Sequence, residues 1–216
     1  MDLRSPAFQS QAALLVIDMQ RDFLPPVDGI GGALEVKDGD AIIPGINTLA
    51  QKFDHVLLTQ DWHPRGHISF ASTHGKQPFK DTIEVAYGTQ HLWPDHCVQG
   101  TPGAEIHPAL DIPHAELLLR KGFRKHIDSY SAFTENDSVT PTGLAGYLRE
   151  RGLKRLFFTG VAYDYCVGYS ALAAARLGFE SIVVEDLTRG IAADSIDSIN
   201  AGFAAAHVER ILSSQL

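Results

Sequence analysis

Cysteine is scarce in this sequence, whose 216 residues contain only Cys97 and Cys166. Two cysteines argue against a disulfide framework and favour a reducing compartment. Long hydrophobic runs are also missing, because the longest early one, "AALLVI", is far too short to span a bilayer. The opening "MDLRSPAFQS" has no apolar segment of the kind found in secretory signals. We therefore expect a soluble, cytoplasmic protein.

Positive charge is in deficit as well, since 26 acidic residues against 18 basic ones leave a formal net charge of -8. Proteins that bind nucleic acid or anionic membranes need clustered Lys and Arg. We expect no nucleic-acid and no membrane partner, and a small neutral or cationic ligand fits better. Internal repeats, low-complexity tracts and linkers are absent too. The length suits one hydrophobic core, so a single domain over residues 1–216 is predicted.

The sequence does contain two kinds of segment in alternation. Short, continuously apolar runs are typical of strands buried on both faces, as in a parallel sheet. Such runs cover residues 13–20, 55–63, 116–122, 155–162 and 181–188. Helix-like stretches cover residues 41–53, 141–152, 164–178 and 194–207. This alternation predicts an α/β three-layer sandwich, with a central parallel sheet flanked by helices.

Two intervals break the alternation. Residues 64–115 are rich in Pro, Gly and His with little periodicity, and residues 123–140 are a shorter example. Most of the ten histidines lie between His55 and His114. Because so long a loop inside a compact domain is usually functional, we expect part of the site in these intervals.

Three reactive side chains stand at the carboxyl ends of different predicted strands. Asp18 follows the first strand, Lys121 the third, and Cys166 comes just after the fourth. Each alone has an ordinary explanation, as a strand-end cap, a solvated lysine or a buried filler cysteine. Open α/β sheets bind ligands outside the carboxyl ends of their strands, so the three should meet on one rim. A carboxylate, an ammonium and a thiol there form a complete set for nucleophilic catalysis.

Cys166 is predicted in the first turn of the helix over residues 164–178. Free backbone N–H groups and the helix dipole favour a thiolate at that position. Asp164, the expected N-cap, would oppose the thiolate with its own negative charge. A cation such as Lys121 would then help to hold the thiolate, and Asp18 could pass the thiol proton to a leaving amine.

A second set of residues indicates a metal site. Asp61 and His63 are two residues apart in an extended segment, so their side chains project to the same side. The candidates for a third ligand are His67, His74, His91 and His96. We choose His96, which stands between two Pro- and Gly-containing turns, while His67 and His74 stay as alternative or outer ligands. Two imidazoles and a carboxylate leave positions open for water or substrate and suit Zn, Fe or Mn.

Cys97, beside His96 in an extended loop, should point the other way and pack in the core. Three aromatic residues follow strand ends or lie in the long loops: Phe23, Trp93 and Tyr130. Aromatic walls would suit a flat ring as the ligand, although any of the three could be a packing residue.

Together these stretches resemble the nicotinamidase (pyrazinamidase) family of the isochorismatase-like cysteine hydrolases. The resemblance covers nearly the whole chain through "ALLVIDMQRDFLP", "TQDWHPRGHISFAS", "WPDHCVQGTPGAE", "RKGFRKHIDSYSAF" and "GVAYDYCVGYSALAAARLGF". It implies the isochorismatase-like hydrolase fold and a metal-dependent deamidation of nicotinamide, and also pyrazinamide, in NAD salvage. Self-association into a homo-oligomer would fit such a family, although no stretch identifies an interface.

The resemblance also assigns roles to single residues. It implies that Asp18, Lys121 and Cys166 are the catalytic triad, and that Asp61, His63 and His96 hold one divalent metal ion, with Zn as the first choice. It implies a cis peptide bond between Val161 and Ala162, which would turn the N–H groups of Ala162 and Cys166 toward an oxyanion. The residues that would line the nicotinamide pocket are Phe23, Trp93, Tyr130, Ala162 and Tyr165.

One departure concerns Tyr163, which stands where the family commonly has Thr in a "GLATDYCV" turn. A bulky side chain there would change the size of the pocket or point away from it. Val161 also stands where Leu or Ile is usual. Two other functions stay open: a different amidase on the same fold, such as one for N-carbamoyl compounds, and a non-catalytic metal-dependent binding module. Isochorismatase activity itself is disfavoured, because that reaction needs no cysteine nucleophile.

Overall fold

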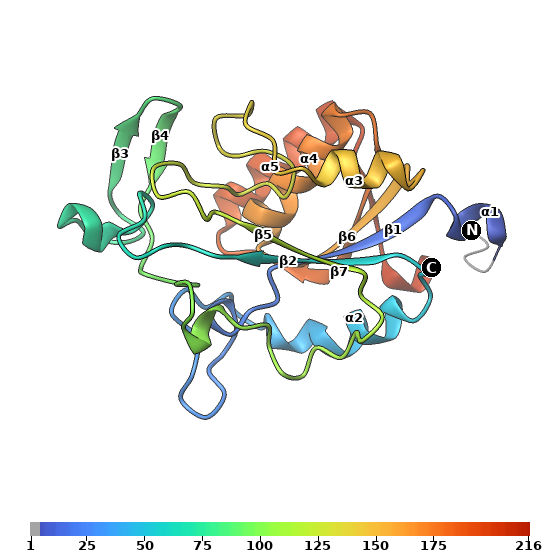
Figure 1. The fold of residues 1–216 in the computed structure, drawn as a ribbon, viewed down its shortest axis with the longest axis horizontal. Helices are drawn as coiled ribbons and strands as arrows, with labels where there is room; N and C mark the ends of the chain where they lie inside the picture. The colour runs from blue at the N-terminus through green and yellow to red at the C-terminus, as the bar shows by residue number, and fades with distance from the viewer. Residues whose placement is uncertain (1–4) are drawn as a thin grey trace.

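A six-stranded parallel sheet forms the centre of this computed structural model, which describes residues 5–216 (Figure 1). Its strands are β1 (Ala12–Ile17), β2 (Val56–Asp61), β5 (Leu117–Lys121), β6 (Arg155–Val161), β7 (Glu180–Arg189) and β8 (Glu209–Ile211), in the spatial order β5-β2-β1-β6-β7-β8. Every strand pair in this sheet is parallel. The predicted α/β architecture is therefore confirmed.

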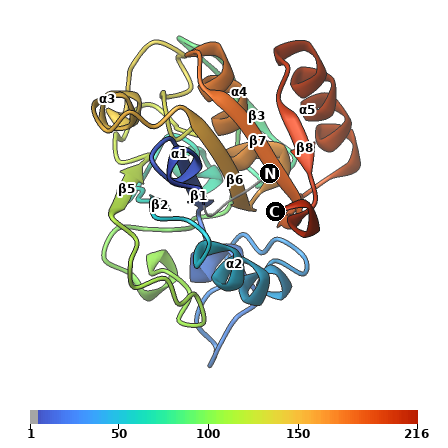
Figure 2. The ribbon, with the colours of Figure 1, turned by 90° about the vertical axis from the view of Figure 1, so that its right-hand side faces the viewer.

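Helices cover both faces of the sheet and make three layers (Figure 2). They are α1 (Pro6–Gln9), α2 (Ile43–Ala50), α3 (Leu144–Glu150), α4 (Gly168–Arg176) and α5 (Ala193–Ala206). Along β1, Leu14 and Val16 pack in the hydrophobic core shared with α2, whereas Leu15 and Ile17 pack in the core shared with α3, α4 and α5. This alternation explains why β1 is apolar throughout, since both of its faces are covered.

The long interval 64–115 contains structure that the sequence did not reveal. An antiparallel hairpin, β3 (Thr82–Val85) and β4 (Gly88–His91), projects from one end of the molecule (Figure 1). Most of its side chains are exposed or half-buried, so its sequence has no apolar run. Strand β8 was also missed, because it has only three residues and one buried side chain.

Short turns of helix complete the chain. The 3₁₀ turns are Arg21–Phe23, Asp40–Ile42, Ala71–His74, Pro102–Ala104 and Ser213–Gln215, and a π-helical turn covers Tyr163–Val167 just before α4. Within residues 5–216, every helix is too short or too polar to cross a membrane. The single domain over residues 1–216 stays a prediction, and residues 1–4 lie outside the described part.

Candidate active site

The carboxyl ends of β1, β2, β5 and β6 bring the predicted reactive residues together. Asp18 directly follows β1, Asp61 and Lys121 are the last residues of β2 and β5, and Cys166 lies five residues beyond β6. Asp61 and Lys121 are also direct partners in the parallel pairing of β2 with β5. The expected meeting of Asp18, Lys121 and Cys166 on one rim is thus present in the fold.

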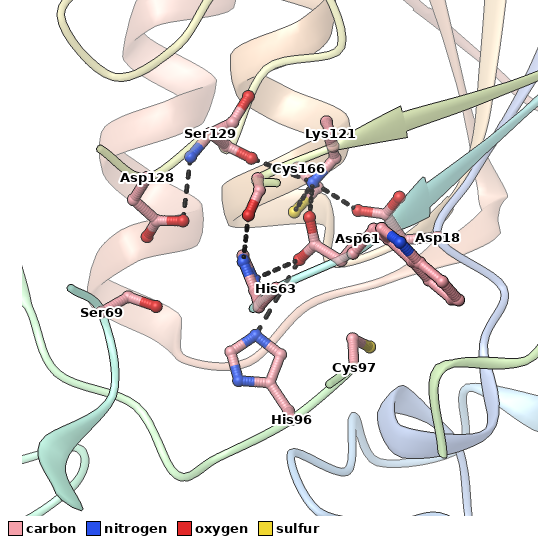
Figure 3. Close-up of polar contacts among 12 residues, drawn as sticks. Asp18, Asp61, His63, Ser69, His96, Cys97, Lys121, Asp128, Ser129 and Cys166 are labelled. Atoms are coloured by element: carbon pink, nitrogen blue, oxygen red, sulfur yellow. Dashed lines mark hydrogen bonds and ion pairs between the residues drawn. The ribbon is translucent and has the colours of Figure 1, made fainter. Parts of the chain in front are cut away.

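Lys121 lies at the centre of this group (Figure 3). Its Nζ lies 2.8 Å from Asp18 Oδ2 and 2.5 Å from Asp61 Oδ1. It also donates to the carbonyl of Ser129 at 3.0 Å and contacts Cys166 Sγ at 3.3 Å. The Lys121 side chain is fully buried, so a low dielectric strengthens its ion pairs with both carboxylates. One ammonium thus joins the predicted triad to the predicted metal ligand Asp61.

Burial and charge set the protonation of this group. Burial would lower the pKa of Lys121, but the carboxylates of Asp18 and Asp61 outweigh it and raise that pKa well above its usual value. Burial raises the pKa of Asp18, although Lys121 opposes the rise. Burial likewise raises the pKa of the Cys166 thiol well above normal, with Asp18 and Asp61 adding to the effect and Lys121 opposing it. Burial and the two carboxylates thus favour the thiol form of Cys166, whereas the start of the helix and Lys121 favour the thiolate.

Thr59 orients the carboxylate of Asp18. Its hydroxyl donates to Asp18 Oδ1 at 2.5 Å and accepts the Asp18 backbone N–H at 3.0 Å. Asp18 also has a positive φ of 49°, a left-handed conformation that is uncommon outside glycine. The Asp18 oxygen, the Cys166 sulfur and an Asp61 oxygen all lie within 4.8 Å of one another. Asp18 is therefore placed to exchange a proton with the thiol.

The turn that carries Cys166 differs from the helix start that was predicted. Residues 163–167 form a π-helical turn, and Ala162 precedes it as the N-cap. Asp164 does not cap its own helix, so that prediction was wrong. Its carboxylate instead accepts the backbone N–H groups of Ile191 and Ala192, at 2.9 and 3.1 Å. The expected cis peptide bond between Val161 and Ala162 is present.

Asp61, His63 and His96 form a group that could hold a metal ion. The Nε2 atoms of His63 and His96 lie 3.4 and 3.9 Å from Asp61 Oδ2. Each Nδ1 faces a backbone carbonyl at 2.8 Å, of Gly122 for His63 and of Pro94 for His96. A carbonyl only accepts, so Nδ1 carries the proton and the Nε2 lone pair is free for a cation. The residues present therefore fit a divalent metal ion.

Electrostatics agree with that fit for Asp61 and His96, whereas for His63 burial would lower the pKa but the Asp61 carboxylate outweighs it and raises that pKa. Burial would raise the pKa of Asp61, but Lys121, His63 and His96 hold it well below its usual range. Burial, together with neighbouring His63, lowers the pKa of His96 to about 4. A carboxylate that stays ionised and an imidazole that stays neutral are the forms that bind metals.

The other candidate histidines lie outside the group of Asp61, His63 and His96, and His67 forms a second group with His63 and Asp128 that could hold a metal ion. His67 is fully buried and stacks on His63 with ring centroids 4.1 Å apart, but its two nitrogens contact the Ser69 hydroxyl and the Ile127 carbonyl. His74 Nε2 contacts the Ile68 carbonyl, and His91 is exposed. Cys97 is fully buried in the core, as expected.

The pocket above these groups is largely aromatic. Its walls are formed by Phe23, Leu34, Asp61, His63, Trp93, His96, Asp128, Tyr130, Ala162, Tyr165, Cys166 and Ile191. Trp93 Nε1 donates to the Tyr130 hydroxyl at 3.2 Å, and Tyr165 meets both rings edge to face, at 5.0 and 5.4 Å. All five residues predicted to line the pocket do so. A planar ring would contact aromatic groups in it while reaching both the thiol and the metal ligands.

Comparison with known proteins identifies the family to which this chain belongs. The isochorismatase domain family matches residues 12–211. The nicotinamidase of Acinetobacter baylyi is 54% identical over 183 residues, which cover 84% of this chain and 83% of that protein. This chain belongs to the isochorismatase family, in its nicotinamidase group.

Solved structures of nicotinamidases agree in fold. The Acinetobacter baumanii nicotinamidase superposes with a TM-score of 0.91 at 51% identity, covering 95% of this chain and 98% of that one. The Pyrococcus horikoshii pyrazinamidase, solved in complex with zinc, superposes with a TM-score of 0.75 at 35% identity, covering 94% and 99%. The likeness therefore extends over nearly the whole length of both chains.

Tyr163, the departure from the usual nicotinamidase turn, points away from the pocket. Its hydroxyl donates to Asn200 Oδ1 at 2.5 Å, and its ring meets Phe203 edge to face at 5.7 Å. Both partners belong to α5. The larger side chain is thus accommodated between the π-helical turn and α5, and it is not among the residues that line the pocket.

Sequence reasoning missed several residues that hold this site. Gln20 is fully buried, and its amide clamps Asp61 by accepting the Asp61 N–H at 2.7 Å and donating to the Asp61 carbonyl at 2.8 Å. Gln20 and Thr59 are each two residues from a predicted site residue along the chain, which is a signal that could have found them. Leu34, Asp128 and Ile191 lie in loops without periodicity, and nothing in their spacing marked them.

Proposed function

We propose that this protein is a metal-dependent amidohydrolase that converts nicotinamide to nicotinic acid and ammonia, and that also accepts pyrazinamide. The observation that carries the proposal is the single aromatic pocket with Cys166 and the Asp61, His63 and His96 group on its walls. The similarity to nicotinamidases over most of the chain supports the same substrate.

In the proposed reaction Asp18 takes the thiol proton as Cys166 Sγ attacks the carboxamide carbon. The backbone N–H groups of Ala162 and Cys166 stabilise the resulting oxyanion. Asp18 returns the proton to the departing ammonia, which leaves a thioester on Cys166. Asp18 then accepts a proton from the water that hydrolyses this thioester and returns it to the departing Cys166 sulfur, and nicotinic acid leaves. Lys121 stabilises the ionised forms of Asp18 and Asp61 throughout.

The ring would be bound between Phe23, Trp93, Tyr130 and Tyr165. Asp61, His63 and His96 would hold one divalent ion, with zinc as the first choice and iron or manganese as alternatives. When bound, this ion would offer an open position to the ring nitrogen, directly or through water. The protein would thus orient the carboxamide toward Cys166 by fixing the opposite side of the ring.

The physiological part of the proposal is salvage of nicotinamide toward NAD in the cytoplasm. The two free cysteines, Cys97 and Cys166, suit a reducing compartment. Self-association stays a prediction.

The test is ammonia release by the zinc-loaded protein from nicotinamide and, in parallel, from benzamide, which lacks the ring nitrogen. We expect turnover of nicotinamide and a strongly reduced kcat/KM for benzamide. Equal kcat/KM for the two amides would refute the role of the metal group in substrate binding. Absence of turnover with nicotinamide and pyrazinamide would favour another amide substrate or a non-catalytic binding module.

A further inference from the structure

Asp128 is a buried carboxylate in the pocket wall that the proposed reaction does not use. Its side chain is 2% exposed, and one of its oxygens lies within 4.8 Å of ring nitrogens of both His63 and His67. Figure 3 places it on the side of His63 opposite Asp61. Asp128 thus lies outside the group of Asp61, His63 and His96, but shares His63 with it in a second group, His63, His67 and Asp128, that could also hold a metal ion.

Two neutral donors hold this carboxylate in place. Asp128 Oδ1 accepts the backbone N–H of Ser129 at 2.9 Å, and Oδ2 accepts the side-chain amide of Gln90 at 2.9 Å. Gln90 is the one buried residue of strand β4. Its side-chain Oε1 accepts a hydrogen bond from the Tyr87 hydroxyl at 3.1 Å. The β3–β4 hairpin thus inserts a single buried side chain toward the pocket, and that side chain fixes Asp128.

Within residues 5–216, no Lys or Arg nitrogen forms an ion pair with Asp128. The nearby ammonium of Lys121 is already shared by Asp18 and Asp61. Of the three buried carboxyl groups Asp18, Asp61 and Asp128, the first two contact this ammonium and Asp128 does not. A buried carboxylate without a cation destabilises the fold, because no ion pair offsets the free energy lost when its hydration shell is removed. A divalent cation bound beside Asp128 would offset the excess negative charge.

We propose that Asp128 is a further residue of the metal site: it is not a ligand, but its fixed negative charge increases the affinity for the divalent ion. This inference rests on the proposed function, because it requires that Asp61, His63 and His96 bind a metal. Asp128 would also offer a hydrogen-bond acceptor to water in the site when such an ion is bound. Gln90 acts as a positioning residue, since it directs the carboxylate of Asp128.

The proposal predicts different effects of one substitution on the metal-free and metal-loaded protein. Asp128→Asn removes the charge with little change of size, and its one oxygen can accept only one of the two hydrogen bonds. Without metal, the removal of an uncompensated buried charge should offset the lost hydrogen bond, so the variant should unfold close to the wild-type temperature. With zinc, the gain in melting temperature should be smaller than in the wild type. A merely structural role would lower the melting temperature equally in both states.

The experiment is competition between the protein and a chelator for Zn²⁺, with melting temperatures measured on the metal-free and zinc-loaded forms. For Asp128→Asn we expect the dissociation constant to rise by about 10-fold or more, the size typical of groups that support metal ligands. Asp197→Asn is the matched control, because it removes the same charge from an exposed position of α5 and should leave zinc affinity unchanged.

The outcomes separate this inference from the proposed function. Asp61→Asn should abolish tight zinc binding if the metal site is assigned correctly. If it does so while Asp128→Asn binds zinc like the wild type, the role of Asp128 is refuted and the metal site stands. Failure of the wild type to bind zinc, iron or manganese would refute both.

A second variant tests the proposal independently, in the event that Asp128→Asn folds poorly. Gln90→Leu leaves the carboxylate in the chain and removes the amide that directs it. We expect weaker zinc binding here too, and an unchanged dissociation constant would contradict the role of Gln90.

Discussion

Asp18, Lys121 and Cys166 come from the carboxyl ends of three strands and reach the pocket through Cys166, whereas Trp93, His96, Asp128 and Tyr130, which also line the pocket, come from loops. We refer to these groups as the strand end and the loop end. Lys121 holds the strand end together through an ion pair of 2.8 Å with Asp18 and a contact of 3.3 Å with Cys166 Sγ. Side-chain and backbone hydrogen bonds hold the loop end. Single substitutions at the two ends should therefore have different effects on stability and activity.

Lys121→Met should have the largest effect on the fold. It would leave the buried carboxylates of Asp18 and Asp61 without their cation, which costs about 3–5 kcal/mol when one partner of a buried ion pair is removed. Activity should be lost with it. Chemical unfolding measures the change, and a loss of less than about 1 kcal/mol would mean that Lys121 is not the centre of the strand end.

Thr59→Val tests the strand end at a single hydrogen bond. It removes the donor to Asp18 Oδ1 while keeping the size of the side chain, and it leaves a buried acceptor unsatisfied at a cost of about 1–3 kcal/mol. Because that donor favours the ionised carboxylate, the acid limb of kcat/KM should move to higher pH. If the acid limb of the kcat/KM profile stayed at the same pH, Asp18 would not be the group whose protonation causes that limb.

Acidification should separate activity from stability. Burial raises the pKa of Asp18 above its ordinary value of 3.8, so kcat/KM should fall already above that pH as Asp18 takes up a proton. The pKa of Asp61 is lower in the folded protein than in the unfolded chain. Its contribution to stability is therefore complete above pH 3.8 and is lost as the pH falls below that value. Activity and unfolding free energy measured against pH would contradict this account if stability were lost first.

Tyr130→Phe should have the smallest effect on stability, and it tests the difference in role between the loop end and the strand end. It removes the hydroxyl that accepts from Trp93, at a cost of about 0.5–1.5 kcal/mol. We expect KM to rise several-fold with little change in kcat, because the loop end binds the ring and the strand end does the chemistry. A fall in kcat with unchanged KM would contradict this division.

The same division explains how much could be predicted from the sequence. Strand-end residues follow apolar runs, and a parallel sheet brings its carboxyl ends together, so Asp18, Lys121 and Cys166 could be grouped before any coordinates. The Asp61 and His63 pair was recognised by its spacing. The protonation of Cys166 could not be predicted from the sequence, because it depends on burial among carboxylates that no sequence pattern reports.

Loop-end residues were harder to predict for a physical reason. Asp128 and Gln90 lie 38 positions apart, and only the folded hairpin brings them to hydrogen-bond distance. Trp93 and Tyr130 were found as aromatic residues in long loops, but their mutual hydrogen bond was not. Asp164 was misassigned because its partners, Ile191 and Ala192, belong to a distant segment that precedes α5.

The most direct test of the central claim is ammonia release from nicotinamide by zinc-loaded wild type and Cys166→Ala, measured side by side. The substitution is small and lies outside the metal group, so the variant should keep its fold and its zinc. We predict release by the wild type and none above background by Cys166→Ala. Release by the variant at the wild-type rate would contradict a cysteine nucleophile at the strand end.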